Sequence, residues 1–339
     1  MINIDETIIT KAAYHHVSVD KARTFYNRKT LDCSAEGYEE LLGQLLLRPF
    51  LSVTETFQFD HQVEIGFNVL YDLATSIHNG KDFVKSSIQI AQHLSSISRH
   101  PNINDGELFV AYFEDLRVGS KHYDALGIYK FESKENFLES FENGNRVDLK
   151  LKKGLSNKKP EKACLIIFSE EPFTVLLLDN ARPYTEYWQQ DFANVRLRSD
   201  DVNDTNNFLA LTRAFVDGPG STELVLVDQI HLLNRSTSYF EQNERFDRQG
   251  FEEQVLQKKE LVDSFGRFGD EYREKHDLEV PTGFKIFSQS VKKLARRFRN
   301  VIRLDTNFHI YIHGDTDLIE QGVDTDGRRY YKLYYTNES

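Results

Sequence analysis

The hydrophobic pattern of this chain changes period near Gly106, and that change limits the folds it can adopt. Upstream, from Phe67 to Ile97, apolar residues recur every three or four positions, as in amphipathic helices. Downstream, five short runs have the composition of strands: 107–118, 123–131, 147–151, 163–168 and 173–178. No helical pattern between these runs is long enough to serve as a crossover. The pattern therefore predicts an antiparallel meander rather than a parallel sheet.

Helices are expected before the meander. An apolar pattern within 34–56 predicts a helix that is ended by Pro49, and a strand or edge segment is expected over 51–59. The long amphipathic stretch that follows predicts two helices, which are broken near Asn79-Gly80 and stopped by Pro101.

The helical period returns after Asp179. Helices are expected over 206–216, 224–234 and about 251–272, and a β-hairpin that joins 304–313 to 330–335 is expected to end the chain. Single hydrophobic cores stop growing near about 250–300 residues, and this chain has 339. We therefore predict an α+β protein of two domains. The first, 1–183, holds N-terminal helices and the antiparallel β-meander, and the second, 184–339, is a mostly helical part closed by the C-terminal β-hairpin.

The charge of the chain restricts how it can meet nucleic acid. It carries 53 acidic and 42 basic side chains, a net charge of −11. Proteins that coat DNA with their whole surface usually have a basic excess. Any contact with DNA must therefore come from a local basic patch.

Cysteine usage and hydropathy indicate a cytoplasmic protein. Cys33 and Cys164 are far apart, without a Cys-x-x-Cys or Cys/His cluster, so neither a disulfide framework nor a zinc site is expected. Cys164 lies in an apolar run and is expected to be a buried, inert thiol. The N-terminus lacks the pattern of a secretory signal, and no apolar stretch approaches the about 20 residues of a membrane span. We expect no membrane association.

The clearest charge feature is the segment 290–303, SVKKLARRFRNVIR, which contains no acidic residue. If it is helical, its apolar residues lie on one face and its cations largely on the other. Such a helix can pair with DNA phosphates, which position a protein without reading sequence. The alternative is a core-packing helix whose cations meet acidic residues of the same chain. The candidate nucleic-acid-binding residues are Lys292, Lys293, Arg296, Arg297, Arg299 and Arg303.

Two other groups of side chains have weaker patterns. A lysine-rich segment around Gly154 predicts either a hairpin tip that touches phosphate or strand ends whose lysines discourage edge-to-edge pairing; it contains Lys150, Lys152, Lys153, Lys158, Lys159 and Lys162. His309 and His313, with Asp315 and Asp317 beyond them, suggest a metal ion. A strand spacing of four, however, separates the imidazoles by about 13 Å. We therefore expect no metal site.

Signatures of catalysis are missing from the sequence. It contains no Gly-x-Ser-x-Gly elbow, phosphate-binding glycine loop, His-Glu-x-x-His or dinucleotide fingerprint. One pattern is typical of metal-dependent nucleases: Asp148-Leu149-Lys150 on a predicted strand, with Asp124 on an earlier one. Acid-x-Lys is a very common triplet, so the expectation is a protein that is not an enzyme and needs no cofactor.

Several segments are similar to the bacterial nucleoid-associated protein family of the NdpA/YejK type, in its Bacteroidetes-like form. In the C-terminal third these are YFEQNERFDRQGFEEQVL (239–256) and LDTNFHIYIHGDTDLIEQGVDTDGRRYYKLYY (304–335). Upstream, DGELFVAYFEDL (105–116), EKACLIIF (161–168) and EYWQQDF (186–192) follow in the expected order. The resemblance covers most of the chain and weakens towards its N-terminus.

The resemblance implies a nucleoid-associated protein of the cytoplasm that contacts DNA or a DNA-processing partner such as a topoisomerase. We predict a protein that binds double-stranded DNA with low sequence specificity. It supplies no catalytic residues that carry over to this sequence. Two alternatives remain open. One is a protein-interaction module that is recruited to the nucleoid by a DNA-processing partner such as a topoisomerase. The other is a metal-dependent nuclease that uses the acid-x-Lys strand.

Overall fold

The chain divides into two compact units, Met1–Arg198 and Ser199–Ser339. The computed structural model describes residues 2–33, 35–98, 103–155, 159–180, 187–218, 226–276, 278–295, 301–304, 306–311 and 318–337. The division falls after the boundary expected at 183/184. The reason is that η4 (Trp188–Ala193) belongs to the core of the first unit, where the Trp188 indole N–H donates to the Ala163 carbonyl over 3.1 Å.

Within the described residues, the first unit is built on a nine-stranded sheet in which every pairing is antiparallel. The strand order is β11-β4-β10-β9-β6-β5-β2-β3, and β1 pairs with β5. The strands are β1 (Ile2–Asn3), β2 (Ile8–Val17), β3 (Phe25–Tyr26), β4 (Phe57–Phe59), β5 (Gly106–Val118), β6 (Lys121–Phe131), β9 (Lys162–Ile167), β10 (Thr174–Asp179) and β11 (Val195–Leu197). The predicted antiparallel meander is confirmed.

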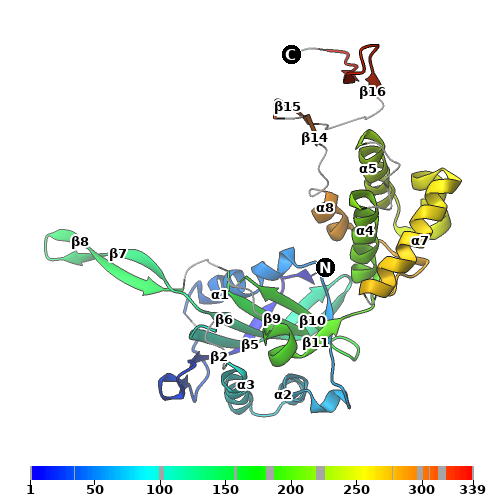
Figure 1. Cartoon of the computed structure of the whole chain (residues 1–339). Coiled ribbons are helices and arrows are strands. Elements are labelled where there is room, and N and C mark those ends of the chain that lie inside the picture. The colour runs from blue at the N-terminus through cyan, green and yellow to red at the C-terminus, as the bar shows by residue number, and fades with distance from the viewer. Residues whose placement is uncertain are drawn as a thin grey trace. The chain divides into compact units, whose positions relative to one another are not determined.

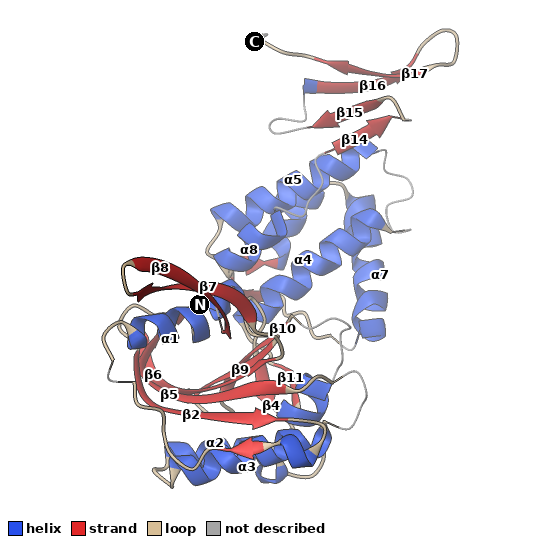
Figure 2. Ribbon diagram, turned by 90° about the vertical axis from the view of Figure 1, so that its left-hand side faces the viewer, coloured by secondary structure: helices blue, strands red, loops and turns tan. Residues whose placement is uncertain are grey.

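Both faces of this sheet are covered by helices. Successive residues of a strand point to opposite sides, so neighbouring residues pack in different clusters. On β5, Val110 packs in a cluster with α2 (Val69–His78) and α3 (Phe83–Ile97). Its neighbour Ala111 packs in a second cluster with α1 (Tyr38–Leu46) and η2 (Arg48–Ser52). Figure 2 shows these two helical layers on opposite sides of the sheet. Two further 3₁₀ turns are η1 (Lys21–Arg23) and η3 (Ile65–Phe67).

Local signals explain where the helices of this unit begin and end. The Asn68 side chain accepts from the Tyr71 amide at the start of α2, and Asp82 accepts from Lys85 at the start of α3. Gly80 between them has a φ of +81°, which favours glycine. The break expected near Asn79-Gly80 is confirmed. The strand expected over 51–59 is correct only for its last residues, since η2 occupies the beginning of that segment.

One pair of strands leaves the sheet. β7 (Glu135–Asn143) and β8 (Arg146–Gly154) pair only with each other and form a hairpin, here called the arm, that extends away from the sheet (Figure 1). The segment 147–151 was expected to be the third strand of the meander, and this is wrong. Its partner is β7, since the turn at Asn143–Arg146, with Gly144 at a φ of +64°, folds the two together.

The second unit is mostly helical, as expected. Its helices are α4 (Asp201–Asp217), α5 (Leu226–Gln242), α6 (Arg248–Phe251), η6 (Glu252–Leu256), α7 (Lys259–His276) and α8 (Ser288–Ala295), with a small sheet of β12 (Arg245–Asp247) and β13 (Gly283–Lys285). Phe208 lies at the centre of its aromatic core, with ring centroids 4.1 Å from Phe246 and 4.9 Å from Phe251. The single helix expected over 251–272 is interrupted where Gln257 has a φ of +63°.

Two hairpins follow in the C-terminal part of the second unit. β14 (Val301–Leu304) pairs with β15 (Phe308–Tyr311), and β16 (Ile319–Val323) pairs with β17 (Arg329–Leu333). A C-terminal β-hairpin is therefore present, but the pairing of 304–313 with 330–335 is wrong. Each strand pairs with its nearer neighbour, and the two hairpins share a small apolar cluster with Ile230 of α5.

A buried ion pair gives the first prediction. Lys162 is fully buried in β9, and its Nζ lies 2.6 Å from the Asp179 carboxylate of β10. Asp179→Asn leaves that ammonium buried without its counter-ion, which typically costs about 3–5 kcal/mol. We expect this loss in urea unfolding followed by the fluorescence of Trp188, the only tryptophan of the chain.

The matched control is Glu170→Gln, which removes the carboxylate that pairs with the exposed Lys121. Exposed pairs contribute less than about 1 kcal/mol. Equal, small losses in the two variants would show that the Lys162 ammonium does not depend on Asp179.

Candidate nucleic-acid interface

Helix α8 carries the described part of the basic segment. Val291 and Ser290 are buried in the aromatic core of the second unit, where α8 packs on α4 and α5. Lys292 and Lys293, the next two residues, are exposed. Both lie in the last turn of the helix, where cations interact favourably with the helix dipole. The helix is therefore amphipathic as predicted, with one side in the core and lysines in solvent.

The expected single helix over 290–303 is wrong in its last part. Val301–Leu304 is strand β14, in which Ile302 is fully buried and Leu304 packs beside it in the same small cluster. The register places Arg303 opposite His309 of β15, and the description of Arg303 covers its backbone only. Arg296, Arg297 and Arg299 lie outside the described residues. The structure thus brings Lys292 and Lys293 together and assigns Arg303 to a different element.

The described strand lysines of the lysine-rich segment do not lie at the tip of a hairpin. The tip of the arm is at Asn143–Arg146, and the lysines Lys150, Lys152 and Lys153 follow along β8 towards its root. Lys152 pairs with Glu139 of β7 over 2.5 Å, and Lys162 is the buried partner of Asp179. Lys158 lies outside the described residues. Lys162 therefore cannot belong to a phosphate-binding cluster, and the charge of Lys152 is already partly neutralised by Glu139.

Strand β17 presents a surface that the sequence-based prediction missed. Tyr330 and Lys332 share a face of it, because alternate residues of a strand point to the same side, and Tyr334 follows directly after its last residue. The Lys332 Nζ lies 6.0 Å and 5.8 Å from the centroids of the two tyrosine rings. Lys332 also pairs with the Glu320 carboxylate, which accepts from the Tyr334 hydroxyl. The face therefore offers exposed rings and a largely neutralised cation; the Tyr-x-Lys-x-Tyr spacing was its signal in the sequence.

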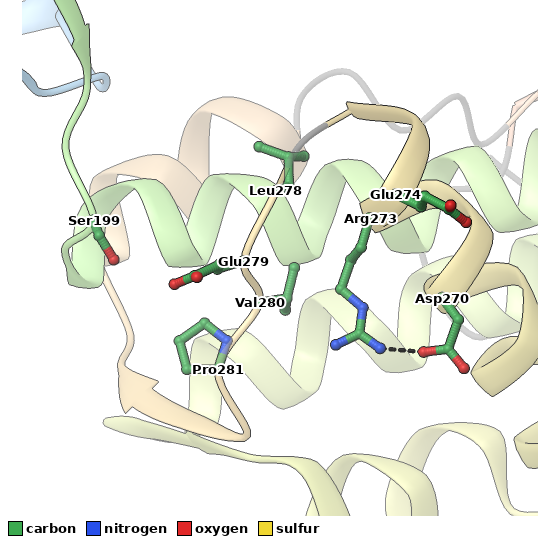
Figure 3. A pocket seen from close by; sticks show the side chains of 8 residues that line it. All are labelled: Ser199, Asp270, Arg273, Glu274, Leu278, Glu279, Val280 and Pro281. Atoms are coloured by element: carbon green, nitrogen blue, oxygen red, sulfur yellow. Dashed lines mark hydrogen bonds and ion pairs between the residues drawn. The ribbon is translucent and has the colours of Figure 1, made fainter. Parts of the chain in front are cut away.

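Another part of the second unit is acidic and unsuited to DNA. A pocket there is lined by Ser199, Asp270, Arg273, Glu274, Leu278, Glu279, Val280 and Pro281 (Figure 3). Its arginine is held by Asp270, as the dashed line shows. Near Glu279, burial and the carboxylates of Asp200, Asp201 and Glu279 raise the pKa of Asp204 to about 6. The carboxylates gathered here, apart from the effect of burial, give a negative local potential, which repels phosphate.

The residues considered for nuclease chemistry are held separately. Asp148 lies near the tip of the arm, where it accepts from Asn143 and Arg146 over 2.8 Å and 3.0 Å. Asp124 belongs to β6 and accepts from the Tyr112 hydroxyl over 2.9 Å. In the part of the chain that the structure describes, no group of three or more His, Cys, Asp or Glu is placed to hold a metal ion. His313, Asp315 and Asp317 are outside that part.

Comparison with known families decides the relationship. The model of the nucleoid-associated protein YejK family matches residues 15–327. The chain belongs to this family. The resemblance read from the sequence is confirmed, and with it a nucleoid-associated role. We found no curated protein and no solved structure that matches the chain. In the described residues, none of the helices has the length and apolar character needed to cross a membrane.

The raised pKa of Asp204 gives the second prediction. Because its folded-state pKa of about 6 lies above the ordinary 3.8, the folded chain holds this proton more tightly than the unfolded chain. The resulting stabilisation is full below about pH 4 and is lost as the pH rises through about 6. Asp204→Asn removes the charge, so we expect it to stabilise the second unit at pH 7 by up to about 2 kcal/mol and hardly at all at pH 4.

The measurement is calorimetric unfolding at the two pH values. Trp188, the only tryptophan, belongs to the first unit. A calorimetric transition that leaves the tryptophan fluorescence unchanged is therefore the unfolding of the second unit. Asp263→Asn, an exposed change on α7, is the control and should act alike at both pH values. A pH-independent effect of Asp204→Asn would contradict the assignment.

Proposed function

We propose that this member of the family binds double-stranded DNA directly, with low sequence specificity, through α8 and the basic segment that follows it. The observation that carries the proposal is the division of α8 between a buried side, with Val291, and two exposed lysines at its C-terminal end. The core fixes the helix, so Lys292 and Lys293 are presented to solvent on a supported element.

The electrostatics of the rest of the chain support a confined contact. A protein with a net charge of −11 repels a polyanion over most of its surface, and the carboxylates around Asp204 are one such region. Lysines that meet phosphates position a protein but carry no base information. Binding through such a patch is therefore expected to be sensitive to salt and insensitive to sequence. The exposed rings of Tyr330 and Tyr334 offer the same unit an aromatic surface beside its charges.

We further propose that the role is binding and not catalysis. Support comes from the two aspartates of the nuclease pattern: each is engaged by its own donors, on different sheets. A role as a protein-interaction module, recruited by a DNA-processing partner such as a topoisomerase, is the second candidate, and the acidic composition favours it.

A salt titration provides the third prediction. For direct binding, the logarithm of affinity falls with the logarithm of salt concentration, with a slope of about −0.9 per neutralised phosphate. Lys292→Gln with Lys293→Gln should weaken binding to all sequences alike and flatten the slope by about 1–2. Arg296→Gln, Arg297→Gln and Arg299→Gln together should act in the same direction. Gel shifts over a salt series measure both quantities.

The matched control is Lys258→Gln with Lys259→Gln, another adjacent, exposed lysine pair of the second unit. It changes the net charge equally and should leave the slope unchanged. If the folded α8 variant keeps the parent affinity and slope, direct binding through this segment is wrong. Nucleoid association must then depend on a protein partner.

The fourth prediction concerns catalysis. Purified protein with Mg²⁺ or Mn²⁺ should leave supercoiled plasmid intact, because the described residues assemble no carboxylate set for a metal ion. Nicking that disappears in the variant Asp148→Ala with Lys150→Ala would overturn the binding proposal in favour of a nuclease. The control variant Glu139→Ala with Lys152→Ala changes the same hairpin but keeps Asp148 and Lys150. If it also lost the nicking, the cause would be damage to the arm and not the loss of a catalytic group.

A further inference from the structure

The two faces of the arm differ in chemistry. The register pairs Phe137 with Lys152, Glu139 with Lys150 and Phe141 with Asp148, which gives one face of charges and rings. It holds two ion pairs within the arm: Lys152 with Glu139, and Asp148 with Arg146. The intervening pairs form the opposite face, here called the aliphatic face: Asn136 with Lys153, Leu138 with Leu151, Ser140 with Leu149, and Glu142 with Val147.

The aliphatic face is uncovered in the single chain. Leu138, Val147, Leu149 and Leu151 leave between 62% and 68% of their surface exposed. A two-stranded hairpin alone is marginally stable in water and needs further strands or a packed face. Contiguous apolar surface on an extended element marks an interaction site. The composition of the arm therefore calls for an occupant on this face.

We propose that the occupant is the aliphatic face of a second copy of this chain. The order of charges along the face carries this choice. Lys153 lies at the root of the arm and Glu142, opposite Val147, lies near its tip, with the three leucines of the face between them. The face is thus complementary to itself when reversed, which is the requirement for a two-fold contact.

The geometry of β-sheets gives this contact its form. Lys153 and Glu142 are separated along the hairpin by six residue steps, about 20 Å. When two arms lie face to face and antiparallel, about 10 Å apart, the root of one meets the tip of the other. Each Glu142 then comes within reach of Lys153 of the other copy. The aliphatic side chains of both copies fill the space between these two charge pairs.

Charge also disfavours pairing of the two arms through like edges. Strand β8 has Arg146, Lys150, Lys152 and Lys153, whereas β7 has Glu135, Glu139 and Glu142. Two copies joined through the same edge in a two-fold dimer would place like charges across the new ladder, which is destabilising. The face-to-face contact has no such penalty. It joins only four aliphatic side chains and two charges of each copy, so a dimer that dissociates on dilution is expected.

The proposed dimer does not depend on DNA binding, and the experiments that test it contain no DNA. A dimer would present two copies of α8, and linked sites strengthen binding through a raised effective concentration.

The first experiment, our fifth prediction, measures sedimentation of the full chain over a concentration series. The parent should pass from monomer to dimer, and Leu149→Asp with Leu151→Asp should remain monomeric because two carboxylates would be buried in the contact. Phe137→Asp with Phe141→Asp, on the opposite face of the same arm, is the matched control and should still dimerise. Unchanged Trp188 fluorescence confirms that each variant keeps the fold of the first unit.

The charges provide a second, independent test. Glu142→Lys and Lys153→Glu should each abolish the dimer, because both contacts then join like charges. Mixing the two variants should restore a dimer, since every contact again joins a cation to an anion. A monomeric parent at every concentration, a dimer that survives Leu149→Asp with Leu151→Asp, or a mixture that stays monomeric would each overturn the proposal.

Discussion

Two buried lysines lie where the chain leaves the main sheet at the end of β6 and where it returns at the start of β9. Lys130, near the end of β6, lies directly opposite Lys162, at the start of β9. Each ammonium has its own carboxylate, Glu132 at 2.8 Å and Asp179 at 2.6 Å, and both lie over the ring of Tyr187. Burial lowers the pKa of Lys130, while Glu132 opposes that effect. Because a buried charge without its partner is strongly destabilising, this arrangement fixes the end of β6 beside the start of β9.

The root of the arm is fastened around the same residues. The Glu161 carboxylate accepts from the Glu132 amide and from the Ser133 hydroxyl, and Lys134 pairs with Glu107 of β5 over 2.6 Å. The sheet itself, buried on both faces, gives these contacts a rigid base. The arm can therefore project from the sheet although, among the described strands, β7 and β8 pair only with each other. The first unit carries the exposed aliphatic face of the arm, and the second carries the exposed lysines of α8.

Sequence patterns predicted most helices and strands. They failed where the spacing of apolar residues in a segment fits both a helix and a strand. Around Ile302 the apolar spacing of 290–303 fits a helix, but Ile302 and Leu304 also fit one face of a strand. The strand forms because Ile310, Ile319 and Tyr331 complete an apolar cluster with them and with Ile230. The same reasoning explains the arm. A strand was expected at 147–151, yet nothing local states whether its partner is the meander or the neighbouring segment.

The sequence by itself determined the α+β class, the antiparallel meander, the break at Asn79-Gly80 and the family. These depend on signals within short segments: hydrophobic period, turn residues and motif order. Only the tertiary structure decided which cations are buried and which are exposed. Lys162 is buried against Asp179, Lys152 is paired with Glu139, and Lys292 and Lys293 are exposed on a helix anchored by Val291. A lysine has the same charge in each setting, and what differs is the burial and the counter-charge supplied by residues far away in the sequence.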